Sequence, residues 1–436
     1  MSVSEIRVDP KIDRPPRRDG SYVLYWMTAY RRTDHNFALQ QAADWARNLD
    51  RPLLVFEALR CGYPWATVRS HTFVLEGMRA NAERCRQAGV AYYPHVETAQ
   101  DAGKGLLEAL ADRACLVVAD DFPAFIHPRL IETATSRLEC RLEAVDSNGI
   151  LPLRVAEDAF DTAYAFRRFL QRELRPHLLD FPEANPLRGV RGAEIPAEIA
   201  RRWPPGIPAD AETLPLDSSV PAVELHGGSH AGEARVREFL DAKLEHYERD
   251  RNKPDEDVAS GLSPYLHFGH VSSHAIVRDL LDRAGWEPDH LSPRTDGKRR
   301  GWWGLPSEQE AFLDQLVTWR ELGFNAAVHM PRYEEFDSLP AVYPSEPIVY
   351  AGAQEPADPT ARVIDLLTPF GKGQRALLAG APRTGKTTIL QHLIRSIETN
   401  HPDLELLVLL LDERPEDVTE MTGWVEKGDV VAAAFD

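Results

Sequence analysis

The sequence predicts an α/β protein in which a parallel α/β domain is followed by a helical domain and then by a second α/β segment. Between residues 21 and 148, short apolar runs alternate with helix-like stretches, which is typical of strand–helix–strand units around a parallel sheet. Between residues 231 and 341, apolar residues recur with helical spacing. Near residue 380, a phosphate-loop pattern lies between an apolar run and a second helix-like stretch.

Composition indicates an ordinary soluble protein. The chain has 436 residues, 43% of them hydrophobic and 27% charged, which suits about two to four domains. A net charge of −18 argues against a mainly electrostatic nucleic-acid binder but leaves room for a local basic groove. None of the four cysteines forms a C-x-x-C pair, so we expect no disulfide framework and no zinc site.

The sequence predicts neither a secretory signal peptide nor a membrane-spanning segment. The polar residues 1–20 contain no signal-peptide core, and we expect them to be disordered. No apolar run approaches the roughly 18 residues that span a membrane. We therefore expect a cytoplasmic protein with no membrane partner.

The first domain, residues 21–148, is predicted to hold a Rossmann-like parallel sheet. Ligands of such sheets bind at the carboxyl ends of the strands, but a G-x-G-x-x-G fingerprint after the first strand is absent. Helices are expected at Asn36–Asn48, Ser70–Gln87 and Gly103–Arg113. Strands are expected at Tyr22–Met27, Pro52–Leu59, Val90–Val96, Cys115–Asp120 and Cys140–Val145.

The middle of the chain is predicted to be a proline-rich interdomain linker at residues 149–230 and an all-helical domain at residues 231–341. Helices are expected from residue 231 past Tyr247, at Val271–Leu281 and at Glu308–Asn325, with Ser263-Pro264 beginning another. Basic residues at Lys298–Arg300 stand beside Trp302 and Trp303. This suits either a nucleic-acid surface or an exposed loop over a buried tryptophan pair.

The phosphate loop is the most specific motif. Gly380–Thr387 matches G-x-x-x-x-G-K-[ST], in which backbone amides surround a β-phosphate and the lysine adds positive charge. The Thr387 hydroxyl is expected to bind the Mg²⁺ that accompanies ATP. We predict a strand at Arg375–Gly380, a helix at Lys386–Asn400 and a buried strand at Leu404–Asp412.

Residues 342–436, with "GKGQRALLAGAPRTGKTTILQHL" and "LLVLLLDERPEDV", resemble the RecA-like ATPase core of the transcription termination factor Rho. The resemblance implies that Glu413 activates the attacking water and that RNA is a possible partner of this segment only. The later Walker B strand and the arginine finger have no counterpart, so we expect a partial domain with little hydrolysis. The implied ATP contacts are Gly371, Lys372, Gly373, Gln374, Arg375, Ala376, Arg383, Thr384, Gly385, Lys386, Thr387, Thr388 and Arg414.

The longer part resembles a class II-type DNA (deoxyribodipyrimidine) photolyase. The residues that carry this are "YWMTAYRRTDHNFAL", "RSHTFVLEGM", "ASGLSPYLHFGHV" and "FLDQLVTWRELGFN", in that order. The resemblance implies an antenna domain at 21–148, with or without a chromophore such as a deazaflavin, and a partial FAD-binding domain at 231–341. The implied FAD contacts are Tyr247, Ala259, Ser260, Gly261, Leu262 and Ser263.

The same resemblance implies repair of cyclobutane pyrimidine dimers in DNA by light-driven electron transfer from reduced FAD, with Trp319, Arg320 and Glu321 at the lesion. After residue 341 the family's further helices are replaced by Rho-like sequence, so we expect impaired repair. Two alternatives stay open. One is an ATP-binding Rho-like module of transcription termination or RNA unwinding, and the other is an inactive chimera of two broken genes.

Overall fold

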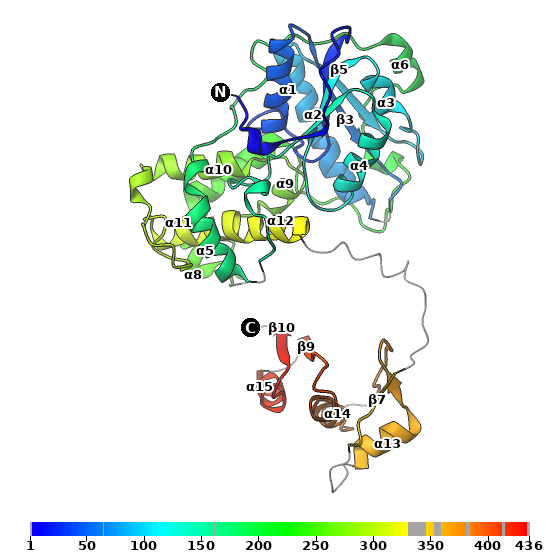
Figure 1. Ribbon diagram of the computed structural model, residues 1–436, viewed down its shortest axis with the longest axis vertical. Coiled ribbons are helices and arrows are strands. Elements are labelled where there is room, and N and C mark those ends of the chain that lie inside the picture. Colours follow the sequence, from blue (N-terminus) through cyan, green and yellow to red (C-terminus); the bar gives the residue numbers. More distant parts are fainter. Residues whose placement is uncertain are drawn as a thin grey trace. The chain divides into compact units, whose positions relative to one another are not determined.

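The structure is a computed structural model that describes residues 2–63, 65–160, 162–253, 255–329, 346–352, 359–380, 384–411 and 415–433. The chain divides into two compact units, residues 1–331 and residues 332–436. Figure 1 shows the elements of both units, coloured along the sequence. Each unit is described by itself.

A six-stranded sheet in the order β1-β6-β5-β2-β3-β4 forms the centre of the α/β domain. Every neighbouring pair from β6 to β4 is parallel, as the alternation of strands and helices predicts. The five predicted strands are confirmed to within a residue at each end. The strands are β1 (Val8–Ile12), β2 (Tyr22–Met27), β3 (Leu53–Leu59), β4 (Ala91–Val96), β5 (Ala114–Asp120) and β6 (Arg141–Val145).

The expectation of a disordered N-terminus is wrong. A short 3₁₀ turn, η1 (Glu5–Arg7), leads into β1, which pairs antiparallel with β6 so that Val8 lies opposite Val145. Residues before β2 therefore complete one edge of the sheet. Arg7, at the end of η1, is fully buried and reaches the junction with the helical domain.

Helices cover both faces of this sheet (Figure 1). On one face, α1 packs on the side chains of Val23, Tyr25 and Val55, and on the other, α3 and α4 pack on those of Leu24 and Leu54. The helices are α1 (Phe37–Asn48), α2 (Val68–Ala88), α3 (Leu106–Ala111) and α4 (His127–Arg137). Asn36 begins α1 by accepting hydrogen bonds from the backbone amides of Ala38 and Leu39, which fixes the loop after β2.

The segment predicted as a linker is folded and packed. The side chains of Phe166 and Leu170 enter the core of the helical domain, whereas Ile199 and Trp203 enter the core between the sheet and α3. Residues 149–230 thus bind both domains together rather than separate them. Their elements are η2 (Leu153–Val155), α5 (Ala163–Glu173), η3 (Arg175–His177), α6 (Ala197–Arg202) and η4 (Ala211–Thr213).

The helical domain is confirmed, with one departure from regular α-helix. Two π-helical segments, η5 and η7, each lie within a longer helix, and such segments often occur at functional sites. Proline in the first turn of α9 confirms the predicted helix start at Ser263. The elements are α7 (Ser229–Glu238), η5 (Phe239–Lys243), α8 (Leu244–Asp250), α9 (Ser263–His267), α10 (Ser273–Arg283), η6 (Pro288–His290), α11 (Ser307–Leu313), η7 (Asp314–Trp319) and α12 (Arg320–His329).

The second unit contains two small sheets. β7 pairs antiparallel with β8, and β9 pairs parallel with β10. The predicted helix at Lys386–Asn400 is confirmed as α14, and a strand forms as β9 within the predicted range Leu404–Asp412. Its predicted burial is wrong, since Leu407 and Leu409 are 66% and 58% exposed. The elements are β7 (Pro347–Ile348), α13 (Pro359–Leu367), β8 (Phe370–Gly371), α14 (Lys386–Asn400), β9 (Leu407–Leu411), α15 (Pro415–Trp424) and β10 (Asp429–Ala433).

The predicted strand at Arg375–Gly380 does not form. Its backbone lies in no ladder, and Leu377 is 91% exposed. Among the residues that the structure describes, β9 and β10 pair only with each other, so this apolar run has no neighbouring strand to bind its amides and carbonyls. No described helix in either unit is both long and apolar enough to cross a membrane.

Candidate functional site

The wall around the predicted flavin residue Tyr247 is aromatic. Tyr247 lies in α8 and is buried, with Phe239 of η5 and Phe312 of α11 edge-on to its ring at centroid distances of 5.4 and 5.6 Å. The guanidinium of Arg251 lies 5.3 Å from the centre of the tyrosine ring. The π-helical turn η5 places Phe239 here, since it rotates the helix before α8 begins.

The turn at residues 259–263, which is predicted to contact FAD, is held in place by Arg235 of α7. Its Nε donates to the carbonyl of Ser260 at 2.8 Å and its guanidinium to that of Ala259 at 3.2 Å. Gly261 has a φ of +64°, and a Cβ there would come within 2.6 Å of the Arg235 guanidinium. The turn therefore needs glycine for its backbone angle, and an added Cβ would also displace the flexible Arg235 guanidinium.

This arrangement fits an anionic cofactor group. The backbone of the turn is fixed in one shape, the amide of Leu262 lies over the Ser260 hydroxyl at 3.4 Å, and Ser263 begins α9. Arg235 fixes the carbonyls of this turn, and its Nη1 also pairs with the carboxylate of Glu238 at 3.0 Å. Sequence reasoning missed Arg235, because an arginine on the polar face of a helix is common and only the fold shows which carbonyls it meets.

The three predicted lesion residues lie in three different environments. Trp319, at the end of η7, is 49% exposed. The guanidinium of Arg320 lies 4.8 Å from the centre of the Phe324 ring, and its Nε is buried without a hydrogen-bond partner. Glu321 is 5% exposed, so these residues do not form one surface.

Glu321 joins the two domains. Its carboxyl accepts hydrogen bonds from the backbone amides of Ile150 at 2.6 Å and of Leu151 at 3.2 Å. Burial raises the pKa of Glu321 to about 8, against a smaller lowering by these amides. This placement differs from the expected contact with a DNA lesion, because the carboxyl faces the protein interior and is already bound.

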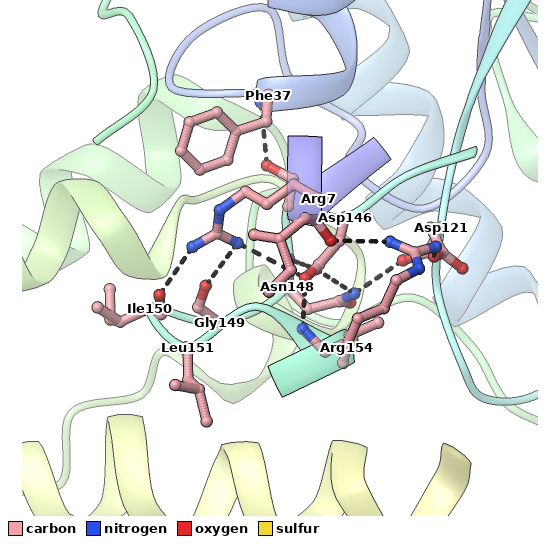
Figure 2. Close-up of polar contacts among 12 residues, drawn as sticks. Arg7, Phe37, Asp121, Asp146, Asn148, Gly149, Ile150, Leu151 and Arg154 are labelled. Atoms are coloured by element: carbon pink, nitrogen blue, oxygen red, sulfur yellow. Dashed lines mark hydrogen bonds and ion pairs between the residues drawn. The ribbon is translucent and has the colours of Figure 1, made fainter. Parts of the chain in front are cut away.

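Figure 2 shows the other side of the same segment, where Arg7 binds the carbonyls of Gly149 and Ile150 at 3.2 and 2.7 Å. Asp146 lies 3.6 Å from the Arg7 guanidinium and accepts from the backbone amide of Leu153 at 2.7 Å. The backbone after β6 is thus held by a cation on one side and by Glu321 on the other. Sequence reasoning missed Arg7, because it placed residues 1–20 outside the fold.

The basic loop before Trp302 and Trp303 fits the second of its two predicted interpretations, an exposed loop over a buried tryptophan pair. Trp302 and Trp303 are buried, and Trp286 donates its indole N–H to the carbonyl of Trp303 at 2.7 Å. Arg299 and Arg300 both bind Glu248. The two indoles belong to the helical core and cannot stack on a nucleic acid from this position.

In the second unit, the helix expected after the phosphate loop forms, whereas the strand expected before it does not. Gly385, in the left-handed region at φ +85°, precedes α14, and Lys386 donates to the carbonyl of Gly380 at 2.8 Å. Thr387 and Thr388 are exposed in the first turn of α14, and Thr384 precedes Gly385. Arg383, Glu413 and Arg414 lie outside the described residues.

The other predicted ATP contacts form a separate turn at residues 371–376. Gln374 closes it by accepting from the backbone amide of Gly371 at 3.1 Å, and Gly373 is left-handed. Lys372 pairs with Glu346 at 2.9 Å, and Arg375 and Ala376 are exposed. Among the described residues, no group of three or more histidine, cysteine, aspartate or glutamate side chains is placed to hold a metal ion.

Comparison with known proteins gives a different relative for each unit. Over 326 residues, or 74% of this chain, the sequence is 29% identical to a deoxyribodipyrimidine photo-lyase of Methanothermobacter thermautotrophicus and covers 65% of that protein. The fold also resembles the crystal structure of a bacterial class III photolyase from Agrobacterium tumefaciens, with a TM-score of 0.50, 16% identity and coverage of 73% of this chain and 61% of that one. The first unit is photolyase-like.

The second unit is Rho-like. Residues 360–434 match the model of the ATP synthase alpha/beta family, nucleotide-binding domain. The chain is 46% identical over 136 residues to transcription termination factor Rho 1 of Ehrlichia chaffeensis, covering 30% of this chain and 32% of that protein. The chain therefore joins a photolyase-like α/β and helical region to a Rho-like nucleotide-binding segment, as both sequence resemblances predict.

Proposed function

We propose that the photolyase-like region binds FAD and carries out light-driven repair of cyclobutane pyrimidine dimers at reduced efficiency. The observation that carries the proposal is the Gly261 turn, because its left-handed backbone angle and the neighbouring Ser260 hydroxyl suit a diphosphate, while Arg235, itself paired with Glu238, fixes the shape of the turn. Reduced FAD, when bound, supplies the electron that splits the dimer. The similarity to a deoxyribodipyrimidine photo-lyase supports this choice of cofactor.

The chain's own residues have distinct tasks in this proposal. Residues 259–263 and Arg235 hold the diphosphate, and Tyr247 closes the site beside an aromatic wall that excludes water. Trp319 presents an exposed indole that can stack on an extruded pyrimidine. Reduced efficiency follows from the junction, since sequence after residue 341 is Rho-like where the resemblance implies more helices of the flavin pocket.

A matched pair of glycine variants tests the flavin site. Gly261 and Gly285 both have positive φ, at +64° and +58°, but only at Gly261 would a Cβ meet another group. We expect Gly261→Ala to retain much less FAD after reconstitution than wild type, and Gly285→Ala to retain as much, measured by flavin absorbance after gel filtration. Equal retention by both variants would show that the turn does not bind the cofactor.

Repair is measured separately on an oligonucleotide with a single thymine dimer under blue light. We expect slow repair by the reconstituted full chain and loss of it in Trp319→Ala with FAD retention unchanged. Flavin binding without any repair would limit the proposal to a flavoprotein. An absence of both would favour the alternative of an inactive chimera of two broken genes.

A second candidate function is ATP binding by the Rho-like segment, as a remnant of a module for transcription termination or RNA unwinding. It is supported by Gly385 and Lys386 at the start of α14 and by the similarity to Rho. A ligand that binds only the folded state at about 100 times its Kd adds about 2.7 kcal/mol of stability. We expect Mg-ATP to raise the melting temperature of wild type and of Lys427→Ala, but not of Lys386→Ala.

A further inference from the structure

A small cavity lies where the carboxyl ends of three parallel strands meet the helical domain of the first unit. Tyr30 and Arg32 follow β2, Phe122 follows β5 and Asn148 follows β6. Gly269, after α9, and Arg320, at the start of α12, close it from the helical side. The space open to the centre of a water molecule is about 10 Å³, which is enough for about one particle of that size.

Two arginine side chains border this cavity without a carboxylate partner. Arg32 is 2% exposed, and its hydrogen bonds go to neutral acceptors: the carbonyl of His35 at 3.1 Å and that of Gly269 at 3.1 Å. Arg320 has a buried Nε with no acceptor. Within the described residues, no carboxylate oxygen lies within 4.0 Å of either guanidinium.

The nearest carboxylates are engaged elsewhere. Asp120 accepts hydrogen bonds from the amides of residues 28, 29 and 30 at 2.7–2.9 Å and from the hydroxyl of Tyr25 at 2.6 Å. Asp34 pairs with Arg84 at 2.9 Å. Glu321 is bound to the backbone after β6. The buried guanidinium of Arg32 and the partly buried guanidinium of Arg320 therefore face one cavity with little direct neutralisation, which is an unfavourable state.

We propose that this cavity binds a halide ion such as chloride between Arg32 and Arg320. The ion is larger than the one water molecule that the space holds, so the partly exposed Arg320 side chain shifts outward to admit it. Such an ion would give the Arg320 Nε–H its missing acceptor and would offset the repulsion between the two guanidinium groups. Desolvation, and after it the repulsion from Arg32, lower the pKa of Arg320 to about 10. The site is independent of the proposed FAD site, since it shares no residue with the Gly261 turn or Tyr247.

A water molecule is the competing occupant. It would accept from the Arg320 Nε and donate to the side-chain oxygen of Asn148, which also lacks a partner. Charge decides in favour of the anion, because water would leave both guanidinium groups without a counter-charge. The two occupants differ in a measurable way, since only an anion is replaced by bromide.

The first test is crystallographic. Crystals of the full chain are soaked in sodium bromide, and anomalous differences are collected at the bromine edge. We expect a peak in hydrogen-bond contact with both Arg32 and Arg320 in wild type, and no peak there in Arg320→Gln. Ordinary density without an anomalous peak in wild type would assign the site to water and overturn the proposal.

The second test is made in solution on the wild-type chain, so it does not depend on the folding of any variant. The melting temperature of the chain is compared in sodium chloride and in sodium gluconate, whose anion is too large for the cavity, at equal ionic strength. We expect chloride to raise the melting temperature by about 1–2 °C, because about 1 kcal/mol shifts a domain of 150–250 residues by about 2–4 °C and the first unit, residues 1–331, is larger. Equal melting temperatures in the two salts would contradict the proposal.

Variants make the second test specific to the cavity. Arg320→Gln should lose the difference between chloride and gluconate, whereas Arg320→Lys, which keeps the charge, should retain part of it. Arg201→Gln, which replaces an exposed arginine of α6, is the matched control and should behave as wild type. A chloride effect that persists unchanged in Arg320→Gln would place the anion elsewhere and overturn the assignment.

Discussion

Replacing Glu321 by glutamine should remove a pH-dependent loss of stability from the photolyase-like region. The carboxyl of Glu321 is buried against the backbone of Ile150 and Leu151, and burial raises its pKa to about 8 from an ordinary value of 4.5. The charged groups that face it are Arg7, which lowers this pKa, and Asp146, which raises it. The native state therefore holds a proton that the unfolded state releases near pH 4.5.

The sign and size of the effect follow from linkage. Because the pKa of Glu321 is higher in the native state than in the unfolded state, its contribution to the free energy of unfolding is complete below about pH 4.5. That contribution is lost as the pH rises through about 8. Between about pH 5 and about pH 9, a single group with these two pKa values loses up to about 4 kcal/mol. Glutamine keeps a carbonyl oxygen for the two amides but has no proton to lose, so its contribution is the same at both pH values.

Urea unfolding followed by tryptophan fluorescence measures this difference, because eight of the nine tryptophans precede residue 330. We expect the wild type to lose stability relative to Glu321→Gln by about 2–4 kcal/mol between about pH 5 and about pH 9. Glu132→Gln, which removes an exposed carboxylate on α4, should track the wild type. Parallel pH profiles of wild type and Glu321→Gln would refute the reasoning from burial.

Three further predictions concern the same region and use the same unfolding assay. Asn36→Ala should reduce stability by about 2–4 kcal/mol, because the amides that begin α1 and the hydroxyl of Tyr25 lose their partner; a loss under about 1 kcal/mol would contradict this. Phe239→Ala should remove about 3–5 kcal/mol, since a fully buried ring leaves a cavity, and a smaller loss would mean that α8 and α11 collapse into the space. Burial lowers the pKa of His270 to about 3, so its share of the stability should be complete above about pH 6.5 and fall as the pH drops toward 3; His270→Asn should flatten this acid limb, and an unchanged limb would exclude His270 as its source.

The strands of the α/β domain could be predicted because their sequences carry the information locally. Tyr22–Met27 and Cys115–Asp120 are apolar on both faces, as strands buried between two layers of helices must be. Val8–Ile12 carries no such signal, since it has two apolar residues and a proline. It is an edge strand that β6 pairs with on one side only, and an edge tolerates proline.

Local pattern was insufficient where a segment's structure depends on its neighbours. In residues 149–230, Phe166, Leu170, Leu174 and Leu178 recur every four residues, but surrounding prolines hide the helix that carries the first two. Arg375–Gly380 shows the opposite error, because an apolar run before a phosphate loop predicts a strand but cannot form one without a partner strand.

The lesion residues show why a motif does not specify a surface. Trp319, Arg320 and Glu321 are consecutive where η7 passes into α12, and consecutive helical residues point about 100° apart. They cannot all face one pocket. Trp319 points to solvent, Arg320 borders the cavity with Arg32, and Glu321 binds the backbone of Ile150. A shared motif can therefore reflect three separate requirements, and that of Glu321 is to dock α12 on the backbone after β6. Sequence similarity alone cannot separate these requirements, because the residues that decide them, Ile150 and Arg32, lie more than 150 positions away.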